Sequence, residues 1–401
     1  MPLKIGQGSV GHWVIRLVWA AAVIALILYI PAKTKAGTVN DITLAIEFAI
    51  AAMSLNLVLG YTGIISLGHS AFFGIGMYTT AILVVNYGWS QGWTLYAAAA
   101  IAFVVGCLVA RPALRLSGIY LAVVTLALAV LFPTLVKWNK LAWLTGGPAG
   151  ISGVSYDDIP SWPLIGDLKG REGRAKFVYW LGILLLAISY AVARGIVKSR
   201  VGRSLVAIRD NDTASAVMGV DRARTKTLVF GTSAAMCALA GSLAAIRLNI
   251  ASPDIPTLTL IGSITFLLIM VLGGAATLWG PIIGAFLFVI IDARTREAGA
   301  SGGGILGTVF NDWLNFIGSP ATLILAIILL VMVFVAPFGV VGLLRRVAAR
   351  VIVIVPRPAG RSVDVSQILV TTEATAAIER APDAPAPPVV ADPFTTPGGP
   401  P

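Results

Sequence analysis

The sequence predicts an all-α fold, a polytopic transmembrane helical bundle of about ten spans. Three observations lead to this prediction. Charged residues make up only 12% of the 401 residues, whereas soluble domains carry about 25%. The mean hydropathy is +0.89. Long apolar runs recur along the chain, and about 20 such residues are needed to cross a hydrocarbon core of about 30 Å. These features exclude an ordinary soluble enzyme.

The apolar runs define the predicted spans in order. They fall near residues 14–31, 40–60, 69–86, 93–110, 118–136, 177–194, 227–248, 258–273, 280–292 and 320–343. In the first, Lys4 and Arg16 precede the stretch "LVWAAAVIALILYI", and this arrangement resembles a signal peptide. The stretch is rather long, no A-x-A site follows and further spans come after it, so we interpret it as an uncleaved helix.

Two glycine-broken stretches interrupt this pattern. The run "LTLIGSITFLLIMVLGGAATLWGPIIGAFLFVII" is too long for one span and short for two, and Pro281 suits the first turn of a new helix. We expect two short helices around a tight inner turn. The stretch "LGYTGIISLGHSAFFGIG" is comparably rich in glycine. Broken segments often line a substrate path, but small residues also allow plain close packing of helices. Both interpretations stay open at this point.

Charge distribution predicts the topology. With the amino terminus inside, inner loops hold 18 of the 29 Lys and Arg residues, and six of the other 11 lie in a long outer loop at 137–176. Cytoplasmic loops are enriched in such residues, so both termini are expected inside. We expect a permease domain over residues 1–345, with an inner loop at 195–226. Residues 346–401 are expected to form a basic, then Pro/Ala-rich, disordered cytoplasmic tail.

Motifs for chemistry are weak. No P-loop pattern occurs, and His12 and His69 are too few for a zinc site of the H-E-x-x-H kind. Cys107 and Cys237 lie in apolar runs and are interpreted as core residues. "GISG" matches the serine motif of rhomboid-type proteases, but no histidine in the second half could activate Ser152. We expect neither a cofactor, a metal nor a nucleic-acid partner.

Polar residues inside spans are candidates for function. Glu47 lies about two turns into the second span and Asn56 lies further along it. Glu47 could meet a substrate ammonium group, although pairing with a neighbouring helix is favoured. Arg247, Asp254 and Asp292 are expected at the membrane interface. The candidate translocation path comprises Glu47, Asn56, Gly74, Gly273, Gly274, Gly280 and Gly284.

The stretch "SRVGRSLVAIRDNDTASAVMGVDRART" interrupts the apolar pattern with five arginines and three aspartates. Val201, Leu205 and Ile208 recur at helical spacing. Asp212 is expected to cap a short helix over 213–218, and Gly219 to end it with positive φ. Six residues span only about 9 Å, so this unit is a knob suited to docking into another protein. A solvated basic loop on anionic lipid is the alternative.

Five blocks of the sequence, in order, resemble the LivM-type permease subunits of branched-chain amino acid ABC transporters. They are "LNLVLGYTGIISLGHSAFFGIGMYTTAIL", "LRLSGIYLAVVTLALA", "LTGGPAGISGV", "SRVGRSLVAIRDNDTASAVMGVDRARTKTLVFGTSAAMCALAGSLAA" and "VLGGAATLWGPIIGAFLF". The resemblance covers most of residues 45–340. In that family the charged loop docks on a cytoplasmic ATPase. The resemblance assigns this role to Arg203, Arg209, Asp212, Thr213, Ala214, Ser215 and Gly219.

The resemblance implies a non-enzymatic inner-membrane permease subunit. Its implied partners are two cytoplasmic ATP-binding subunits, a LivH-like second permease, a periplasmic substrate-binding protein and membrane lipid. One departure is Ala216, where the family commonly has a glutamate; the tail also lies outside the family pattern. The rival classes are a self-contained secondary transporter or channel and a membrane-embedded enzyme. Urea, short amides or aromatic acids are alternative substrates within the family.

Overall fold

The computed structural model describes residues 3–6, 25, 27–31, 33–113, 119–154, 170–301, 339–343, 346 and 352–355. Most of the predicted spans 14–31 and 320–343, the middle of the outer loop and the tail beyond residue 355 lie outside the described residues. The chain divides into two compact units. The first comprises Met1–Leu3 and Val14–Val353, and the second Lys4–Trp13 and Ile354–Pro401. Strands β1 (Leu3–Gly6) and β4 (Ile352–Val355) pair with each other.

Helices occupy the other eight predicted spans. They are α2 (Ala36–Thr62), α3 (His69–Val85), α4 (Gln91–Ala113), α5 (Ile119–Val136), α7 (Gly170–Lys198), α10 (Arg222–Leu248), α11 (Leu260–Gly273) and α12 (Gly280–Ser301). Of these, α7 and α12 extend several residues beyond the predicted runs 177–194 and 280–292. Two short helices, α8 (Arg200–Asp210) and α9 (Asp212–Val217), lie between α7 and α10. The predicted glycine turn lies between α11 and α12; α11 is short as predicted, with 14 residues, whereas α12 has 22 residues and is not.

Within the described residues, four helices are long and apolar enough to cross a membrane, namely α2, α10 and most of α4 and α7. A fifth follows if α5 is counted together with the segment Asn139–Thr145, which is bent from it by 64°. That segment contains the 3-10 turn η1 (Asn139–Leu141) and helix α6 (Ala142–Thr145). Helices α3 and α11 are apolar but shorter. The fold is therefore a helical membrane bundle, whereas the count of ten spans and their sidedness stay predictions.

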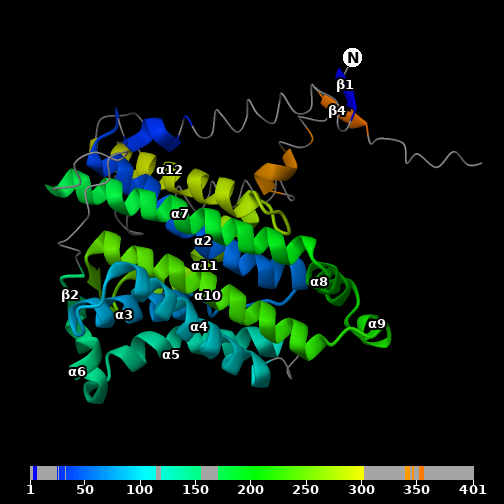
Figure 1. Ribbon diagram of the computed structural model, residues 1–401, viewed down its shortest axis with the longest axis horizontal. Coiled ribbons are helices and arrows are strands. Elements are labelled where there is room, and N and C mark those ends of the chain that lie inside the picture. Colours follow the sequence, from blue (N-terminus) through cyan, green and yellow to red (C-terminus); the bar gives the residue numbers. More distant parts are fainter. Residues whose placement is uncertain are drawn as a thin grey trace, which may run out of the picture. The chain divides into compact units, whose positions relative to one another are not determined.

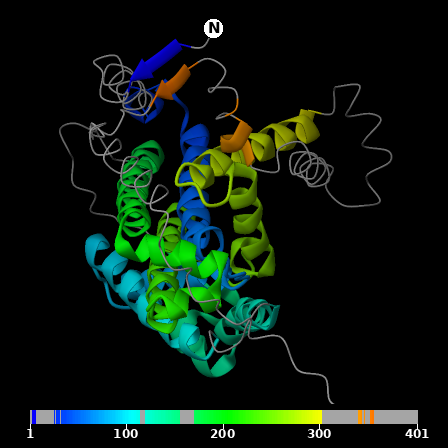
Figure 2. The ribbon, with the colours of Figure 1, turned by 90° about the vertical axis from the view of Figure 1, so that its right-hand side faces the viewer.

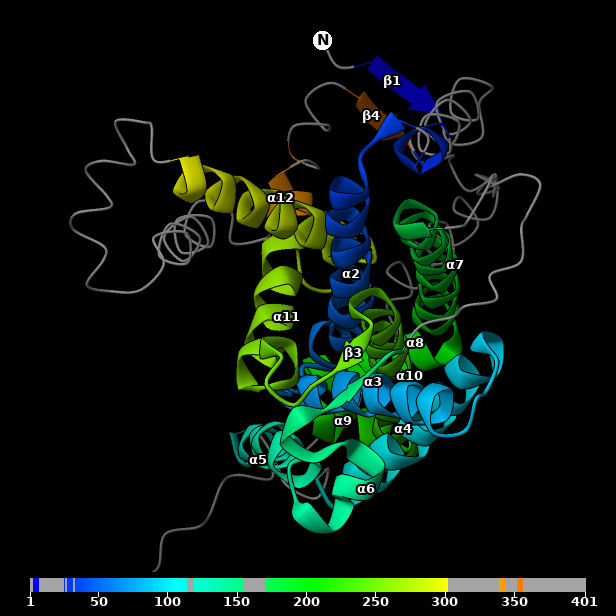
Figure 3. The same ribbon diagram turned by 90° about the vertical axis from the view of Figure 1, so that its left-hand side faces the viewer.

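Helix α2 forms the centre of this bundle. It packs against α7, α10, α11 and α12, and Figure 3 shows it running vertically between α11 and α7. Nearly every side chain from Ala45 to Val58 is buried. Helix α10 crosses α3 so closely that a Cβ at Gly76 would lie 1.9 Å from the Ala238 carbonyl oxygen. Such close backbone approach is what small residues permit in membrane helices.

The two ends of this bundle differ in chemistry. At one end are α6 and the strand pair β2 (Ile151–Ser152) and β3 (Ile250–Ala251), which are antiparallel (Figure 1). Exposed aromatic residues lie in or near the α3–α4 and α5–α6 connections, namely Tyr87, Trp89, Trp93, Tyr96, Trp138 and Trp143. Aromatic side chains of this kind favour membrane–water interfaces. Helices α8 and α9 lie at the other end, which faces the viewer in Figure 2.

Candidate functional site

Helix α8 is the base of the charged segment. Its side chains divide into two faces, with Leu205 and Ile208 buried and Arg203 exposed. Ser199 caps it by accepting a hydrogen bond from the Val201 amide at 3.1 Å. Two residues of the predicted apolar spacing, Leu205 and Ile208, thus fix one face of α8 against the bundle, whereas the third, Val201, is 41% exposed. The helix contacts α2, α7 and α10.

Asn211 is the joint between α8 and α9. Its amide donates to the Ala207 carbonyl at the end of α8. Its Oδ1 accepts from the Ala214 amide at 2.9 Å at the start of α9. The prediction that Asp212 caps this helix is therefore wrong by one residue. Both side chains suit a cap, but Asn211 has the extended backbone, φ −156°, that a cap needs.

Helix α9 ends as predicted at a glycine with positive φ, because Gly219 has φ +82°. The Val220 amide donates to the Ser215 carbonyl, and the Gly219 amide donates to Ala216. These two bonds form a Schellman motif, which requires a left-handed residue between them. A Cβ at Gly219 would meet nothing within 4 Å. The requirement for glycine here is therefore conformational rather than steric.

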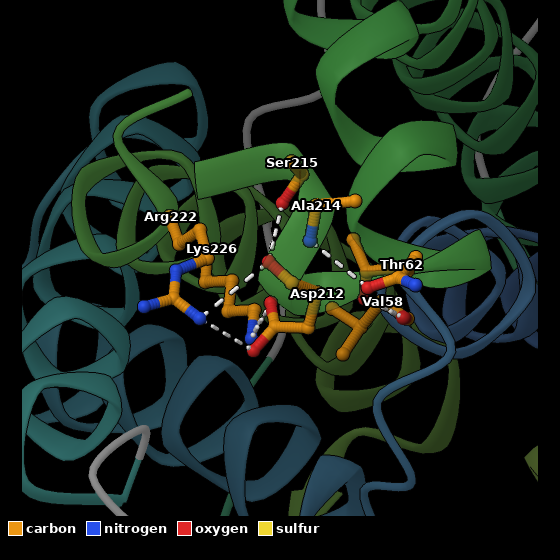
Figure 4. A network of polar contacts seen from close by, with 8 residues as sticks. Val58, Thr62, Asp212, Ala214, Ser215, Arg222 and Lys226 are labelled. Atoms are coloured by element: carbon orange, nitrogen blue, oxygen red, sulfur yellow. Dashed lines mark hydrogen bonds and ion pairs between the residues drawn. The ribbon is translucent and has the colours of Figure 1, made fainter. Parts of the chain in front are cut away.

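Asp212 holds α9 to the start of α10 (Figure 4). Its carboxylate lies 3.1 Å from the Arg222 guanidinium and 2.9 Å from the Lys226 ammonium. The Lys226 side chain is only 17% exposed, so water screens this ion pair less than a surface pair. Ser215 is buried and donates to the Asp212 carbonyl at 2.7 Å. The first turn of α9 is thus fixed on the bundle.

Arg209 connects the segment to the end of α2. Its Nη1 donates to the Gly60 carbonyl at 3.2 Å, and its guanidinium also pairs with Asp210. Its aliphatic part lies beside Gly63, where a Cβ would approach Arg209 Cγ to 3.1 Å. Arg209 therefore contacts the end of α2, although its side chain is still 37% exposed. Arg203, Thr213 and Ala214 are exposed as well.

The exposed tip of this structure is apolar. Val217 is 84% exposed and Met218 is 83% exposed, directly before Gly219. Sequence reasoning missed these two residues and emphasised the charged ones instead. The signal that could have found them is the adjacent bulky pair Val217-Met218 in an otherwise polar loop. We call residues 211–219, with this tip, the coupling knob.

The second set of candidates gathers where α11 turns into α12. Asn56 on α2 donates to the Thr277 carbonyl at 2.8 Å and accepts from the Ala276 amide at 2.9 Å. Ala276 has φ +56°, a conformation that costs a non-glycine residue about 1 kcal/mol or more. The buried Asn56 thus holds an irregular, strained turn that is itself partly exposed.

The candidate glycines lie in tight contacts. A Cβ at Gly273 would lie 1.8 Å from the Gly280 carbonyl oxygen, and one at Gly284 would lie 2.2 Å from that of Ile269. Gly274 has φ +121° and packs near Gly280. These residues and Asn56 come together at one turn. Gly74 lies apart from this turn, on α3, and packs against the Phe132 ring of α5. A Cβ at Gly74 would lie 2.1 Å from Phe132 Cε1.

Glu47 is also separate from that turn and forms a buried ion pair. Its Oε1 and Oε2 accept from Arg247 Nε at 2.7 Å and Nη2 at 3.0 Å. The side chains of Glu47 and Arg247 are 1% and 14% exposed. The favoured prediction for Glu47, pairing with a neighbouring helix, is confirmed. The prediction that Arg247 reaches the interface is wrong, because its guanidinium turns inward to this carboxylate.

His69 begins α3 and is enclosed by hydroxyl groups. Its Nδ1 lies 3.1 Å from Ser66 Oγ and its Nε2 lies 2.8 Å from Ser233 Oγ. Ser233 donates its own hydrogen to the Ser54 carbonyl at 2.6 Å, so its oxygen accepts from His69 Nε2. This chain of bonds joins α2, α3 and α10. Both ring nitrogens of the buried His69 therefore have hydrogen-bond partners, and His69 fixes the break before α3.

Comparisons with known proteins agree with this architecture. A profile of the family described as "Branched-chain amino acid transport system / permease component" matches residues 37–336. The high-affinity branched-chain amino acid transport system permease protein LivM of Escherichia coli K12 is 32% identical over 307 residues, which cover 72% of this chain and 70% of that protein. The LivM protein of Salmonella typhimurium LT2 is 31% identical over the same shares. The permease protein LivH of Escherichia coli K12 is 24% identical, over 76% of this chain and 94% of LivH. No solved structure matches the chain.

Proposed function

Because the chain belongs to the family of permease components of branched-chain amino acid transport systems, we propose that it forms one part of the membrane path of an ATP-driven importer. Its relatives include both LivM and LivH proteins, which supports pairing with a second, LivH-like permease. The substrates proposed are branched-chain or related amino acids, delivered by a periplasmic binding protein. ATP hydrolysis is assigned to two separate cytoplasmic subunits.

The coupling knob is the proposed docking element for an ATP-binding subunit. The observation that carries this proposal is the apolar tip of Val217 and Met218, more than four-fifths exposed, on a helix that Asn211 and Asp212 fix to the bundle. Burying a fully exposed side chain of this kind contributes about 1.5–3 kcal/mol. Because α9 is already fixed to the bundle, docking also loses less conformational entropy.

The same tip explains how the chain can dock without a glutamate at Ala216. Where the family commonly has a glutamate, this chain has a half-buried alanine beside Val217. A knob that docks through apolar contact does not depend on a carboxylate there. The lipid-bound alternative is less favoured, because Lys226 is mostly buried and paired with Asp212, and Arg209 donates a hydrogen bond to the Gly60 carbonyl of α2.

The proposed translocation path runs beside the turn that Asn56 holds. Irregular backbone inside a membrane survives only where protein or a water-filled cavity satisfies it. The stretch 63–68, between α2 and α3, is a second irregular segment, and it includes the buried Ser66. Both irregular segments pack against α2 or its end. Glu47 and Arg247 are assigned a supporting role that holds α2 to α10.

The knob end is proposed to face the cytoplasm, in the inner membrane. Inner loops are expected to carry the excess of Lys and Arg. The segment from Arg194 to Lys226 holds eight of them, whereas the opposite end carries the exposed aromatic residues. Residues 346–401 are proposed to form a cytoplasmic tail.

The docking proposal is tested by making the tip polar. In the variant Val217→Ser/Met218→Ser, the ATP-binding subunits should co-purify at least tenfold less well, while membrane abundance stays normal. A matched control is Val201→Ser, since Val201 is also exposed, at 41%, but lies at the start of α8. Undiminished co-purification of the double variant would remove the docking role from the tip.

A further inference from the structure

A groove runs between α4 and the first turns of α10. It has a volume of about 790 Å³, and its floor includes Cys107 and Thr227, whose Sγ and carbonyl oxygen lie 3.7 Å apart. Its apolar lining includes Val104, Leu108 and Leu228. These three side chains are 55%, 59% and 45% exposed. The groove therefore lies on an outer face of the bundle.

Two arginines stand at one end of the groove. Arg111 comes from the last turn of α4 and Arg224 from the first turn of α10. Within the described part of the chain, neither guanidinium forms an ion pair. The one carboxylate of the described lining, Asp221, is engaged as the cap of α10, accepting from the Arg224 amide at 3.0 Å. This end of the groove thus presents a net positive charge.

The order of these groups follows the axes of α4 and α10. Arg111 ends the apolar window of α4, and Phe103 lies eight residues, about 12 Å, deeper along the helix. On α10, Leu228 lies about 6 Å deeper than Arg224. The groove is therefore cationic at the interface and apolar below it. A neighbouring transmembrane helix would require an apolar surface along its whole length, whereas a phospholipid has this same order of anionic head and hydrocarbon tail.

We propose that this groove is a binding site for one anionic phospholipid of the cytoplasmic leaflet. The phosphate would lie between Arg111 and Arg224, and an acyl chain would lie along Val104, Leu108 and Leu228. Basic pockets between helices on this side of a membrane suit anionic head groups. The leaflet assignment rests on the inward orientation proposed above. The lining of the groove shares no residue with the coupling knob of residues 211–219.

Native mass spectrometry of the whole transporter tests the site. The complex is taken from vesicles of equal phosphatidylglycerol and phosphatidylcholine, and the lipids retained per complex are counted. Each arginine near anionic lipid contributes a preference of about fivefold. In the variant Arg111→Gln/Arg224→Gln, one phosphatidylglycerol per copy should therefore be lost. The control Arg194→Gln/Arg200→Gln removes two exposed arginines outside the groove and should retain it. Equal retention in parent and groove variant would overturn the proposal.

A second measurement identifies the occupant without changing any charge. A photoreactive phenylalanine analogue at position 108, activated in the assembled transporter, should crosslink to phosphatidylglycerol more than to phosphatidylcholine. Crosslinking mainly to a protein subunit would assign the groove to a subunit interface instead. Equal crosslinking to both lipids would make it ordinary lipid-facing surface. Since the transport assay is not used, failure of this site would leave the proposed permease function standing.

Discussion

The Glu47–Arg247 ion pair allows a prediction with a worked magnitude. Both oxygens of Glu47 accept hydrogen bonds from Arg247, at 2.7 and 3.0 Å, and the carboxylate is fully buried. Removing one partner of such a pair costs about 3–5 kcal/mol, whereas replacing both with apolar residues is often neutral. Arg247→Met should therefore destabilise the protein strongly, because it leaves Glu47 buried without its partner.

Glu47→Leu should cost less than Arg247→Met. Arg247 is the penultimate residue of α10 and is 14% exposed, so a released guanidinium can extend towards the interface. Glu47 lies eleven residues after the start of α2 and fifteen before its end, and it has no such route. The double variant Glu47→Leu/Arg247→Met should recover most of the stability lost in Arg247→Met.

Thermal unfolding of the purified protein in detergent measures these differences. At about 2.1 cal/mol/K per residue, unfolding of the proposed permease domain, residues 1–345, has an entropy of about 0.72 kcal/mol/K. A loss of about 3–5 kcal/mol then lowers the Tm by about 4–7 °C. If the double variant is as unstable as Arg247→Met, the cost does not come from an unpaired charge. If the double variant is stable but transports nothing, Glu47 and Arg247 act in the path rather than as a clamp.

Two further predictions concern packing and topology. Gly284→Leu should reduce stability by about 1–3 kcal/mol and cut uptake, because its Cβ would collide with the backbone of α11. Gly74→Leu should have a smaller effect, since only a phenylalanine ring must move. Gly92→Ala serves as the control, because a Cβ there would meet nothing within 4 Å. Uptake by Gly284→Leu equal to the parent would show that the helices can separate freely. In a chain whose two native cysteines are replaced, Ser161→Cys should react with an impermeant thiol reagent in spheroplasts and Ser204→Cys only after lysis; the reverse pattern would contradict the proposed orientation.

Much of the fold could be predicted because hydrophobic length is a direct signal. Eight apolar runs correspond to helices, from α2 to α12, since a chain in lipid must satisfy its own backbone by forming helices. Gly219 was also predictable, because few other residues adopt positive φ readily. The end of α9 therefore follows from local chemistry alone.

The partners that could not be predicted are those of residues distant in the sequence. Glu47 and Arg247 are 200 positions apart, and a single sequence gives no sign that α2 and α10 are neighbours. Asn56 holding the turn at Ala276 is of the same kind. The missed tip at Val217 has a different cause, because a hydrophobic pair in a polar loop is read as core unless the surrounding packing is known.

The central claim, that the knob between α8 and α10 couples this chain to ATP hydrolysis, is tested most directly at Gly219. At φ +82° a β-branched residue is strained by more than the roughly 1–2 kcal/mol of an ordinary residue, whereas asparagine tolerates this region. In the reconstituted transporter, stimulation of ATP hydrolysis by loaded binding protein should be lost in Gly219→Val and kept in Gly219→Asn, with normal membrane abundance of both. A lipid-bound loop would instead be indifferent to Gly219 and sensitive to Arg203→Gln. Full stimulation in Gly219→Val would contradict the account.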